Sequence, residues 1–583
     1  MAKRGRAVNA GLAAASDGTR CGLRAWPPAP STAAHRSTGD PILRHMILAA
    51  GAAMSLAVPV AAQDHGPDRN ALNRIIDEGT NHSQVMTTAE HLSDVIGPRL
   101  TNSPGMRRAE AWTQAKFSEW GLRNVHKEGF AFGRGWWIER SGVRMVTPRP
   151  VQLTAIPIAW TPATAGAITA PVIVAPISRE RDFAKWHGQL GGKVVMVTLP
   201  AAAKDPTDPA LKRYTGEELS KLDQFQQPTY DPAAADRRLQ RLDFARKLDA
   251  FLKGEGAVAM ATMSGRDGKL VSGEGYLFGV GETPALPAVQ IAQEDYLRLA
   301  RLAKVGPAPT VEIASDVRFD DSDANAYNIL AEIPGSDPRA GYVMAGAHLD
   351  SWVAGDGSAD NGAGSAMIME AARIIAASGA RPKRTIRFAL WAGEEQGILG
   401  SMAYVEQHLA HRGPAEDAGT AGGRGMQRYY GYTNRWPITP RPGYGELAAY
   451  FNIDNGSGKL RGLYAETNPA VVPIFREWLA PLASMGANTV VVRPTGGTDH
   501  VFMQSVGVPG FQFIQDPLDY GSRVHHSSID TYDHLKAEDM RQGAIVLASV
   551  LVSAANAERP LPRTPLPTQP AVTDPFAYSA DDD

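Results

Sequence analysis

Two patterns of apolar positions alternate through the second half of the chain. Short apolar runs, typical of buried strands, are followed by longer segments in which apolar residues recur every three or four positions, as on one face of a helix. In the segment 361–379, Met367, Ala371, Ile374 and Ile375 share such a face. The predicted strands lie at residues 342–350, 385–395, 446–456 and 508–516, and the predicted helices at residues 361–379, 401–409 and 469–486. The alternation predicts an α/β fold with a mostly parallel sheet that helices cover on both faces.

The region before this alternation begins with two predicted helices. Residues 70–95 and 103–122 both have helical periodicity. Ser103 and Pro104 supply an N-terminal cap and a first turn for the second helix, and Gly121 is expected to end it. The helical part of the fold therefore starts well before the first buried strand.

A smaller module is predicted between these helices and the regular alternation. Residues 124–132 have the pattern of a strand, and between about residues 150 and 285 short β-rich runs alternate with charged helical stretches. We therefore expect a small α/β or β-rich module inserted into a larger domain. The predicted divisions are a leader with a signal peptide, the first part of the main domain, the inserted module, the rest of the main domain and a Pro-rich acidic tail, at residues 1–62, 63–150, 151–285, 286–557 and 558–583.

An export signal is predicted near the N-terminus. Arg44 precedes an apolar run at 47–58, and residues 60–62 have the small-x-small pattern that a signal peptidase cleaves. We expect the mature chain to begin near Gln63, in the periplasm or outside the cell, with no stable membrane insertion after cleavage. Residues 1–45 are either an overextended start or an unstructured leader, and a buried apolar segment is the alternative for the run itself.

The composition excludes several classes of partner and of catalytic chemistry. A chain of 583 residues with 43% hydrophobic and 21% charged residues is expected to form two or more globular domains. The net charge of −2 gives no sign of a nucleic-acid partner. Cys21 is the only cysteine, which excludes disulfides and thiolate catalysis. A metal ion would have to be held by histidines and carboxylates.

Such residues gather where the predicted strands end. Each occurrence alone is weak, because paired glutamates are usually solvated and a single aspartate after a strand is usually a turn residue. In an open α/β sheet, however, the carboxyl ends of the strands meet at one edge, where ligands bind. The residues that four segments bring to this edge are His348, Asp350, Asp360, Glu394, Glu395, Asp454, His525 and His526. Their coincidence predicts a metal site rather than a solvated loop.

Five segments also carry a resemblance to a known family. In chain order they resemble the motifs of the co-catalytic zinc exopeptidases, which include secreted bacterial aminopeptidases, glutamate carboxypeptidases and transferrin receptors. The segments are "HLDSWVAGDGSADNGAG", "LWAGEEQGILGS", "FNIDNGSG", "GGTDHVFMQSVGVPG" and "VHHSSIDT". The sequences of these motifs are most similar to those of the carboxypeptidase Q (plasma glutamate carboxypeptidase) branch. The resemblance covers residues 70–150 and 285–557, and the inserted module resembles a protease-associated domain.

The resemblance implies two zinc ions per chain, bridged by Asp360. It implies that His348 and Asp454 complete the ligands of one ion, and that Glu395 and His526 complete those of the other. Carboxylates and imidazoles suit zinc, although the same ligands would also accept manganese or cobalt.

The resemblance also assigns roles beside the ions. Glu394 is implied as the general base that takes a proton from the attacking water. Asp350 is implied as the carboxylate that fixes the imidazole of His348.

Two adjacent histidines require a choice. His526 is favoured as the ligand because it stands four residues before Asp530, which matches the family's spacing. If the segment is extended, adjacent side chains point in opposite directions, so His525 is expected in the wall of the site. Asp499 and His500 are further candidates for wall or substrate contacts.

The implied function is a secreted or periplasmic zinc exopeptidase that hydrolyses dipeptides or short peptides with free termini. An aminopeptidase is the alternative, because the motifs do not determine the walls of the pocket. A non-catalytic, receptor-like member is disfavoured because the ligands and the base are all present, and a glutaminyl cyclase because such sites use one zinc ion. A structural metal is disfavoured because it seldom needs an unliganded carboxylate such as Glu394. The branch is often dimeric, which makes a homodimer one outcome to test, and the Gly-, Arg- and Tyr-rich segment 411–445 is either a lid or a disordered loop.

Overall fold

The computed structural model describes residues 69–203, 209–225, 234–413 and 435–566. The predicted leader and signal peptide lie outside these residues, as do most of the segment 411–445 and most of the predicted tail. Among the described residues, none of the helices combines the length and apolar character needed to cross a membrane.

The larger sheet contains the strands predicted in the second half of the chain. Its eight strands follow the order β1-β10-β12-β11-β15-β18-β16-β17. Their bounds are β1 Arg123–Ala131, β10 Asn325–Ile333, β11 Tyr342–His348, β12 Thr385–Trp391, β15 Leu447–Asn452, β16 Leu460–Tyr464, β17 Thr489–Val491 and β18 Gly510–Gln515. The four central strands, β12, β11, β15 and β18, are parallel. Their outer neighbours β10 and β16 run antiparallel to them, so the parallel character predicted from the sequence belongs to the centre of the sheet.

Burial explains why these four strands are mostly apolar. Every residue of β11, β15 and β18 is buried, as are the last four of β12. Parallel strands covered on both faces bury both sets of alternating side chains, which removes the polar alternation of a half-exposed strand.

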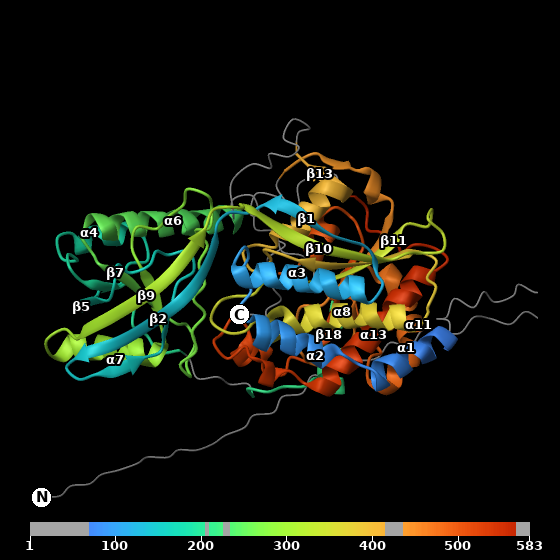
Figure 1. The fold of residues 1–583 in the computed structure, drawn as a ribbon, viewed down its shortest axis with the longest axis horizontal. Helices are drawn as coiled ribbons and strands as arrows, with labels where there is room; N and C mark the ends of the chain where they lie inside the picture. Colours follow the sequence, from blue (N-terminus) through green and yellow to red (C-terminus); the bar gives the residue numbers. More distant parts are fainter. Residues whose placement is uncertain (1–68, 204–208, 226–233, 414–434, 567–583) are drawn as a thin grey trace, which may run out of the picture. The chain divides into compact units, whose positions relative to one another are not determined.

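Helices cover both faces of this sheet, as predicted. Three long helices, α3 (Pro104–Glu119), α8 (Ala363–Ala377) and α13 (Ala537–Asn556), pack on one face against β10 and β11 (Figure 1). The short helices α9 (Leu399–Tyr404) and α12 (His500–Ser505) contact each other and the strands β10, β15 and β18. Helix α11 (Val472–Leu479) packs beside β17 and contacts α13. The predicted α/β fold is confirmed.

The N-terminal helices differ in one respect from the prediction. The segment 70–95 forms two helices, α1 (Arg69–Asn81) and α2 (Val85–Glu90), and the latter continues as a π-helical turn to Ile96. The break occurs where the backbone N–H of Gln84 donates to Glu370 of α8 rather than to the preceding turn. The start of α3 is as predicted, because the side chain of Ser103 accepts from the backbone N–H of Met106.

A second sheet lies in the earlier part of the chain. Its eight strands follow the order β3-β2-β9-β5-β6-β7-β8-β4. Their bounds are β2 Gly135–Thr147, β3 Val151–Leu153, β4 Ala155–Pro157, β5 Ile168–Val174, β6 Val194–Met196, β7 Ala259–Met263, β8 Ala288–Ile291 and β9 Thr310–Asp320. The helices of this region are α4 Phe183–Trp186, α5 Gly216–Lys221, α6 Ala234–Gly254 and α7 Gln293–Val305, and a separate two-stranded ribbon pairs β13 Ala410–Arg412 with β14 Ile438–Pro440.

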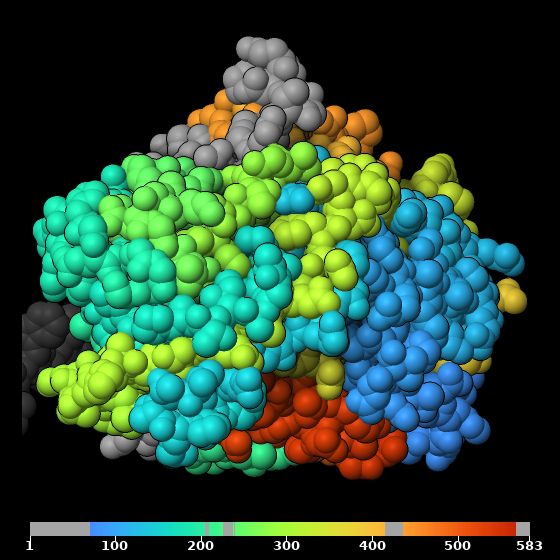
Figure 2. Space-filling view, turned by 60° about the vertical axis from the view of Figure 1, so that its left-hand side comes forward, coloured from blue at the N-terminus to red at the C-terminus, as the bar shows by residue number. Residues whose placement is uncertain are grey.

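The second sheet draws together segments that are distant in sequence. Strands β2 and β9 pair along most of their length and lie side by side in Figure 1. Figure 2 shows cyan and yellow-green residues, from before and after the predicted insert, next to each other on the surface. The sheet therefore includes strands on both sides of residues 151–285, the predicted insert. It has its own buried apolar cluster, which includes Val172, Val194 and Ile291. The division of the chain into domains stays a prediction, and the strands from β2 to β9, with the helices between them, are called the second-sheet module below.

Candidate metal centre

Three predicted ligands meet at the carboxyl edge of the larger sheet. His348 is the last residue of β11, Asp454 follows β15, and Asp360 lies in the π-helical turn Ser358–Gly362 before α8. The Nε2 atom of His348 lies 3.4 Å from Oδ1 of Asp360 and 3.3 Å from Oδ1 of Asp454. Ligand atoms of all three residues lie within 4.8 Å of one another, which suits a single ion.

The other oxygen of Asp360 faces a second set of residues. Its Oδ2 atom lies 3.4 Å from Nε2 of His526. The same nitrogen lies 2.9 Å from Oε2 of Glu395, which follows the end of β12. Asp360 therefore stands between two groups, each with one imidazole and one further carboxylate.

The donor set fits metal ions. Oδ2 of Asp360 and Oε1 of Glu395 are buried and have no hydrogen-bond partner among the described residues. A buried carboxylate oxygen without a partner is costly unless it binds a cation. Oxygen and imidazole nitrogen donors at this spacing are those that zinc uses in catalytic sites.

A buried arginine holds the glycine-rich loop that carries Asp360. The guanidinium of Arg99 donates to the backbone carbonyls of Leu349, Asp356 and Gly357, at 2.8, 2.8 and 2.6 Å. Arg99 is fully buried, and each of these hydrogen bonds is made by a charged donor. The loop is thus fixed around a single side chain, and no sequence motif pointed to Arg99.

Asp530 holds the turn that contains Asp360. Its carboxylate accepts from the backbone N–H groups of Ala359, at 2.6 Å, and Asp360, at 3.0 Å. Burial, together with the Asp360 carboxylate, raises the pKa of Asp530 to about 8. Asp530 was not among the predicted site residues, although its place in "HSSIDT" was a signal that it belongs to the site.

Asp350 contacts both sides of the centre. The backbone carbonyl of Asp350 lies 2.9 Å from Nδ1 of His348, whereas its carboxylate Oδ1 lies 3.8 Å away. The carboxylate instead accepts from the backbone N–H of Glu394 and of Glu395, at 3.2 and 3.3 Å, and from the hydroxyl of Thr101. The carbonyl therefore orients the His348 ring, and the carboxylate fixes the backbone of the two glutamates.

Glu394 is a buried carboxyl among other acids. Burial raises the pKa of Glu394 well above its usual value, and the neighbouring carboxylates of Asp454, Asp499 and Glu395 raise it further. A raised pKa makes a carboxylate a better proton acceptor, as a general base requires.

The two adjacent histidines do not point in opposite directions. His526 has a φ angle of 50°, so the segment is not extended, and the argument from alternating side chains was wrong. The rings of His525 and His526 stack with their centroids 3.8 Å apart. Nε2 of His525 also comes within 3.7 Å of Oδ2 of Asp360. The contact of His526 with Glu395 still favours His526 as the ligand, which stays a prediction.

Asp499 and His500 lie at the start of α12 and are fully buried. Burial raises the pKa of Asp499 to about 8 and lowers the pKa of His500 to about 4. Nε2 of His500 lies 3.0 Å from the hydroxyl of Thr495. Both side chains are inaccessible to solvent, and their contact with substrate stays a prediction.

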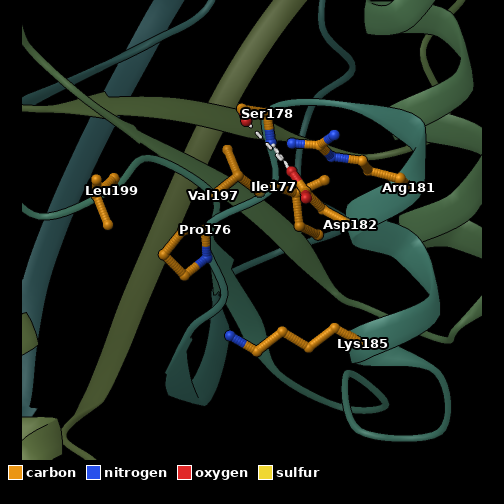
Figure 3. Close-up of a pocket in the computed structure, with 8 residues that line it drawn as sticks. All are labelled: Pro176, Ile177, Ser178, Arg181, Asp182, Lys185, Val197 and Leu199. Atoms are coloured by element: carbon orange, nitrogen blue, oxygen red, sulfur yellow. Dashed lines mark hydrogen bonds between the residues drawn. The ribbon is translucent and has the colours of Figure 1, made fainter.

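A pocket of about 500 Å³ lies elsewhere, in the second-sheet module (Figure 3). It contains none of the predicted site residues. Its lining residues are Pro176, Ile177, Ser178, Arg181, Asp182, Lys185, Val197 and Leu199. The Asp182 carboxylate accepts from the backbone N–H and the hydroxyl of Ser178 and so closes a local turn.

Comparison with known proteins agrees with this geometry. The model of peptidase family M28 matches residues 328–551. Bovine (Bos taurus) carboxypeptidase Q is 26% identical over 529 residues, which cover 88% of this chain and 97% of that protein. Mouse (Mus musculus) carboxypeptidase Q is 28% identical over 480 residues, which cover 81% and 86% of the two chains.

Solved structures show the same fold. A peptidase M28 precursor from Shewanella amazonensis matches with a TM-score of 0.59 and 22% identity, over 86% of this chain and all of that chain. A zinc aminopeptidase from Bacillus subtilis matches with a TM-score of 0.51 and 17% identity, over 81% and 95% of the two chains. The family model, the curated relatives and the fold point to the same assignment. Residues 328–551 are similar to peptidase family M28, and most of the chain is similar to carboxypeptidase Q, which supports a metallo-exopeptidase.

Proposed function

We propose that this protein is an exported zinc exopeptidase that hydrolyses dipeptides and short peptides with free termini. The observation that carries the proposal is the position of Asp360, whose two carboxylate oxygens face two different imidazoles at 3.4 Å. Such a carboxylate is the natural bridge between two ions, and a two-ion site with a nearby base is suited to hydrolysis.

The residues that would hold the ions divide into two sets around Asp360. His348 and Asp454 would complete one site, and Glu395 and His526 the other. When bound, two zinc ions lower the pKa of water and polarise the scissile carbonyl.

The remaining chemistry belongs to Glu394. Its carboxylate accepts the proton of the attacking water and passes it to the nitrogen of the leaving amine. The Asp350 carboxylate supports this role, because it accepts from the backbone N–H of Glu394 and so fixes the position of the Glu394 backbone. Burial of Glu394 keeps bulk water away from this proton transfer.

The likeness to proteins named carboxypeptidase Q supports action at a peptide terminus. The test compares three forms of one dipeptide: free, N-acetylated and C-amidated. If the zinc-loaded protein cleaves only the free form, both termini are recognised and the proposal holds. Cleavage of the amide, with only acetylation inhibiting, would make the enzyme an aminopeptidase.

The protein is also proposed to act outside the cytoplasm, on the evidence of the apolar run at 47–58 and the cleavage pattern at 60–62. N-terminal sequencing of the mature protein from the periplasm or medium is expected to begin near Gln63. An uncleaved protein that stays in the cytoplasm would contradict export. Light scattering of the purified protein would show whether the homodimer forms.

A further inference from the structure

We propose that Glu274 is a positioning residue for the metal centre, and that the second-sheet module supplies it. Oε1 of Glu274 lies 3.2 Å from Nδ1 of His526. The other ring nitrogen of His526 faces Glu395 at 2.9 Å and Asp360 at 3.4 Å. The inference rests on the proposed two-ion centre and adds a residue that none of the five motifs contains.

The role follows from the two nitrogens of an imidazole. A carboxylate that accepts at Nδ1 holds the proton there and leaves the lone pair of Nε2 for a metal ion. It also fixes the rotation of the ring. His348 obtains the same support from the backbone carbonyl of Asp350, at 2.9 Å from its Nδ1. The two predicted imidazole ligands are therefore oriented by equivalent contacts from different parts of the chain.

His526 needs an external support more than His348 does. His348 ends a buried central strand and its side chain is 1% exposed. The His526 side chain is 26% exposed, and its backbone has a φ angle of 50° in a loop after a short π-helical turn. Without a contact at Nδ1, the direction of the ring would depend on its Nε2 contacts and on packing against His525 and Trp352.

Glu274 is itself held in place. The hydroxyl of Tyr276 donates to its second oxygen, Oε2, at 3.2 Å. The chain on either side is closely packed: a Cβ on Gly275 would lie 2.2 Å from the backbone carbonyl oxygen of Ala159, and the Gly273 carbonyl accepts from the N–H of Ala159 at 2.8 Å. The hydrogen bond holds this backbone against Ala159 and the close packing leaves it little room, so the backbone at Glu274 has a defined position.

Further contacts keep this segment beside the histidines. The guanidinium of Arg266 donates to the backbone carbonyl of His525 at 2.5 Å. The Trp352 ring packs edge-on against both Tyr276 and His526, with centroids 5.6 and 6.1 Å apart. The second-sheet module thus contacts the loop of His525 and His526 through Arg266 and through Glu274, which lies against the ring of the predicted ligand.

The test measures zinc affinity by competition with a chelator, using the full chain. Two zinc ions are expected to bind with different affinities. Glu274→Ala is expected to lower the affinity of the weaker site by about 10- to 100-fold, the usual effect of removing the hydrogen-bond partner of a metal ligand. Glu274→Gln keeps an acceptor oxygen near Nδ1, so it is expected to recover a large part of the lost affinity.

The matched control is Glu255→Ala. Glu255 forms the same kind of pair in the same module, with Oε1 2.8 Å from Nδ1 of His187, but touches no predicted ligand. This control is expected to leave both zinc affinities unchanged.

Unchanged zinc affinity in Glu274→Ala would overturn the assignment, as would an equal loss in the Glu255→Ala control. If Glu274→Gln bound zinc as weakly as Glu274→Ala, this result would overturn the claim that Glu274 orients the His526 ring through a hydrogen bond. Because zinc binding is measured without substrate, the outcome is separate from the proposed activity. A wild-type protein that cleaves no peptide, together with a zinc loss specific to Glu274, would refute the proposed function and leave this inference standing.

Discussion

His348 and His526 stand on opposite sides of Asp360, but the molecule supports them differently. His348 ends a strand at the centre of the larger sheet, and a carbonyl two residues along the chain orients its ring. His526 lies in a loop, and the carboxylate at its Nδ1 comes from Glu274, 252 positions away. One half of the centre is built locally, whereas the other half depends on contact with the second-sheet module.

The difference separates two physical requirements of a two-ion site. A buried strand end places a ligand accurately because the backbone around it cannot move without breaking the sheet. A loop residue at the mouth of the site is accessible to substrate, but it needs side-chain contacts to keep one orientation. We therefore expect the half with His348 to bind its ion more tightly than the half with His526.

The largest effect is expected from the residue shared by both halves. Asp360→Ala removes the carboxylate that faces both predicted imidazole ligands, so both ions should be lost and activity should fall below detection. Metal content by mass spectrometry checks this result. Asp356→Ala is the control in the same loop, because the hydrogen bonds of Asp356 described here are made by its backbone. Two ions retained in Asp360→Ala would exclude a bridging role.

Glu394→Gln should separate chemistry from metal binding. The variant loses the proton acceptor but none of the predicted ligands, so kcat is expected to fall by roughly 10³- to 10⁴-fold with two zinc ions still bound. Kinetics and metal analysis of the same sample provide the measurement. Near-normal kcat in a fully loaded variant would remove Glu394 as the base.

A comparison of His526→Ala with His525→Ala tests the half of the centre that lies in the loop. His526→Ala should bind one ion instead of two, because its Nε2 is the nitrogen nearest Glu395. His525→Ala should retain two ions and change kcat/KM by about 10-fold or less, as expected of a wall residue. The reverse pattern would show that His525 is the ligand.

The smallest effect concerns Glu466, a buried carboxyl that accepts from the backbone N–H of Thr495. Burial raises the pKa of Glu466 to about 7 from an ordinary value of 4.5. A carboxyl with a raised folded pKa contributes stability that is complete below its unfolded pKa and is lost as the pH rises through the folded pKa. Between pH 5 and 8, the free energy of unfolding of the wild type should therefore fall by about 2 kcal/mol relative to Glu466→Gln.

Urea unfolding of the metal-free proteins at several pH values checks this last prediction. Glu446→Gln, at an exposed glutamate, serves as the control and should follow the wild type at every pH. A constant difference between wild type and Glu466→Gln across the range would show that Glu466 does not titrate as described.

Much of the larger sheet was predictable because its information is local. The buried strands β11, β12, β15 and β18 appear as apolar runs, and the cap of α3 is visible in the adjacent Ser103 and Pro104. The sequence alone did not predict β10, whose antiparallel pairing with β12 makes the sheet mixed. It also could not anticipate that β2 and β9 pair with each other, because strand pairing depends on contacts between residues more than 160 positions apart.

The sequence by itself determined which residues are able to form the centre, since carboxylates and imidazoles follow the ends of strands in the order of a known family. Only the tertiary structure decided how they face one another. The stacking of His525 on His526 follows from a left-handed backbone angle that the motif does not reveal. Arg99 and Glu274 approach the site from distant segments, and their roles exist only after the chain has folded, because a hydrogen bond depends on position in space rather than in sequence.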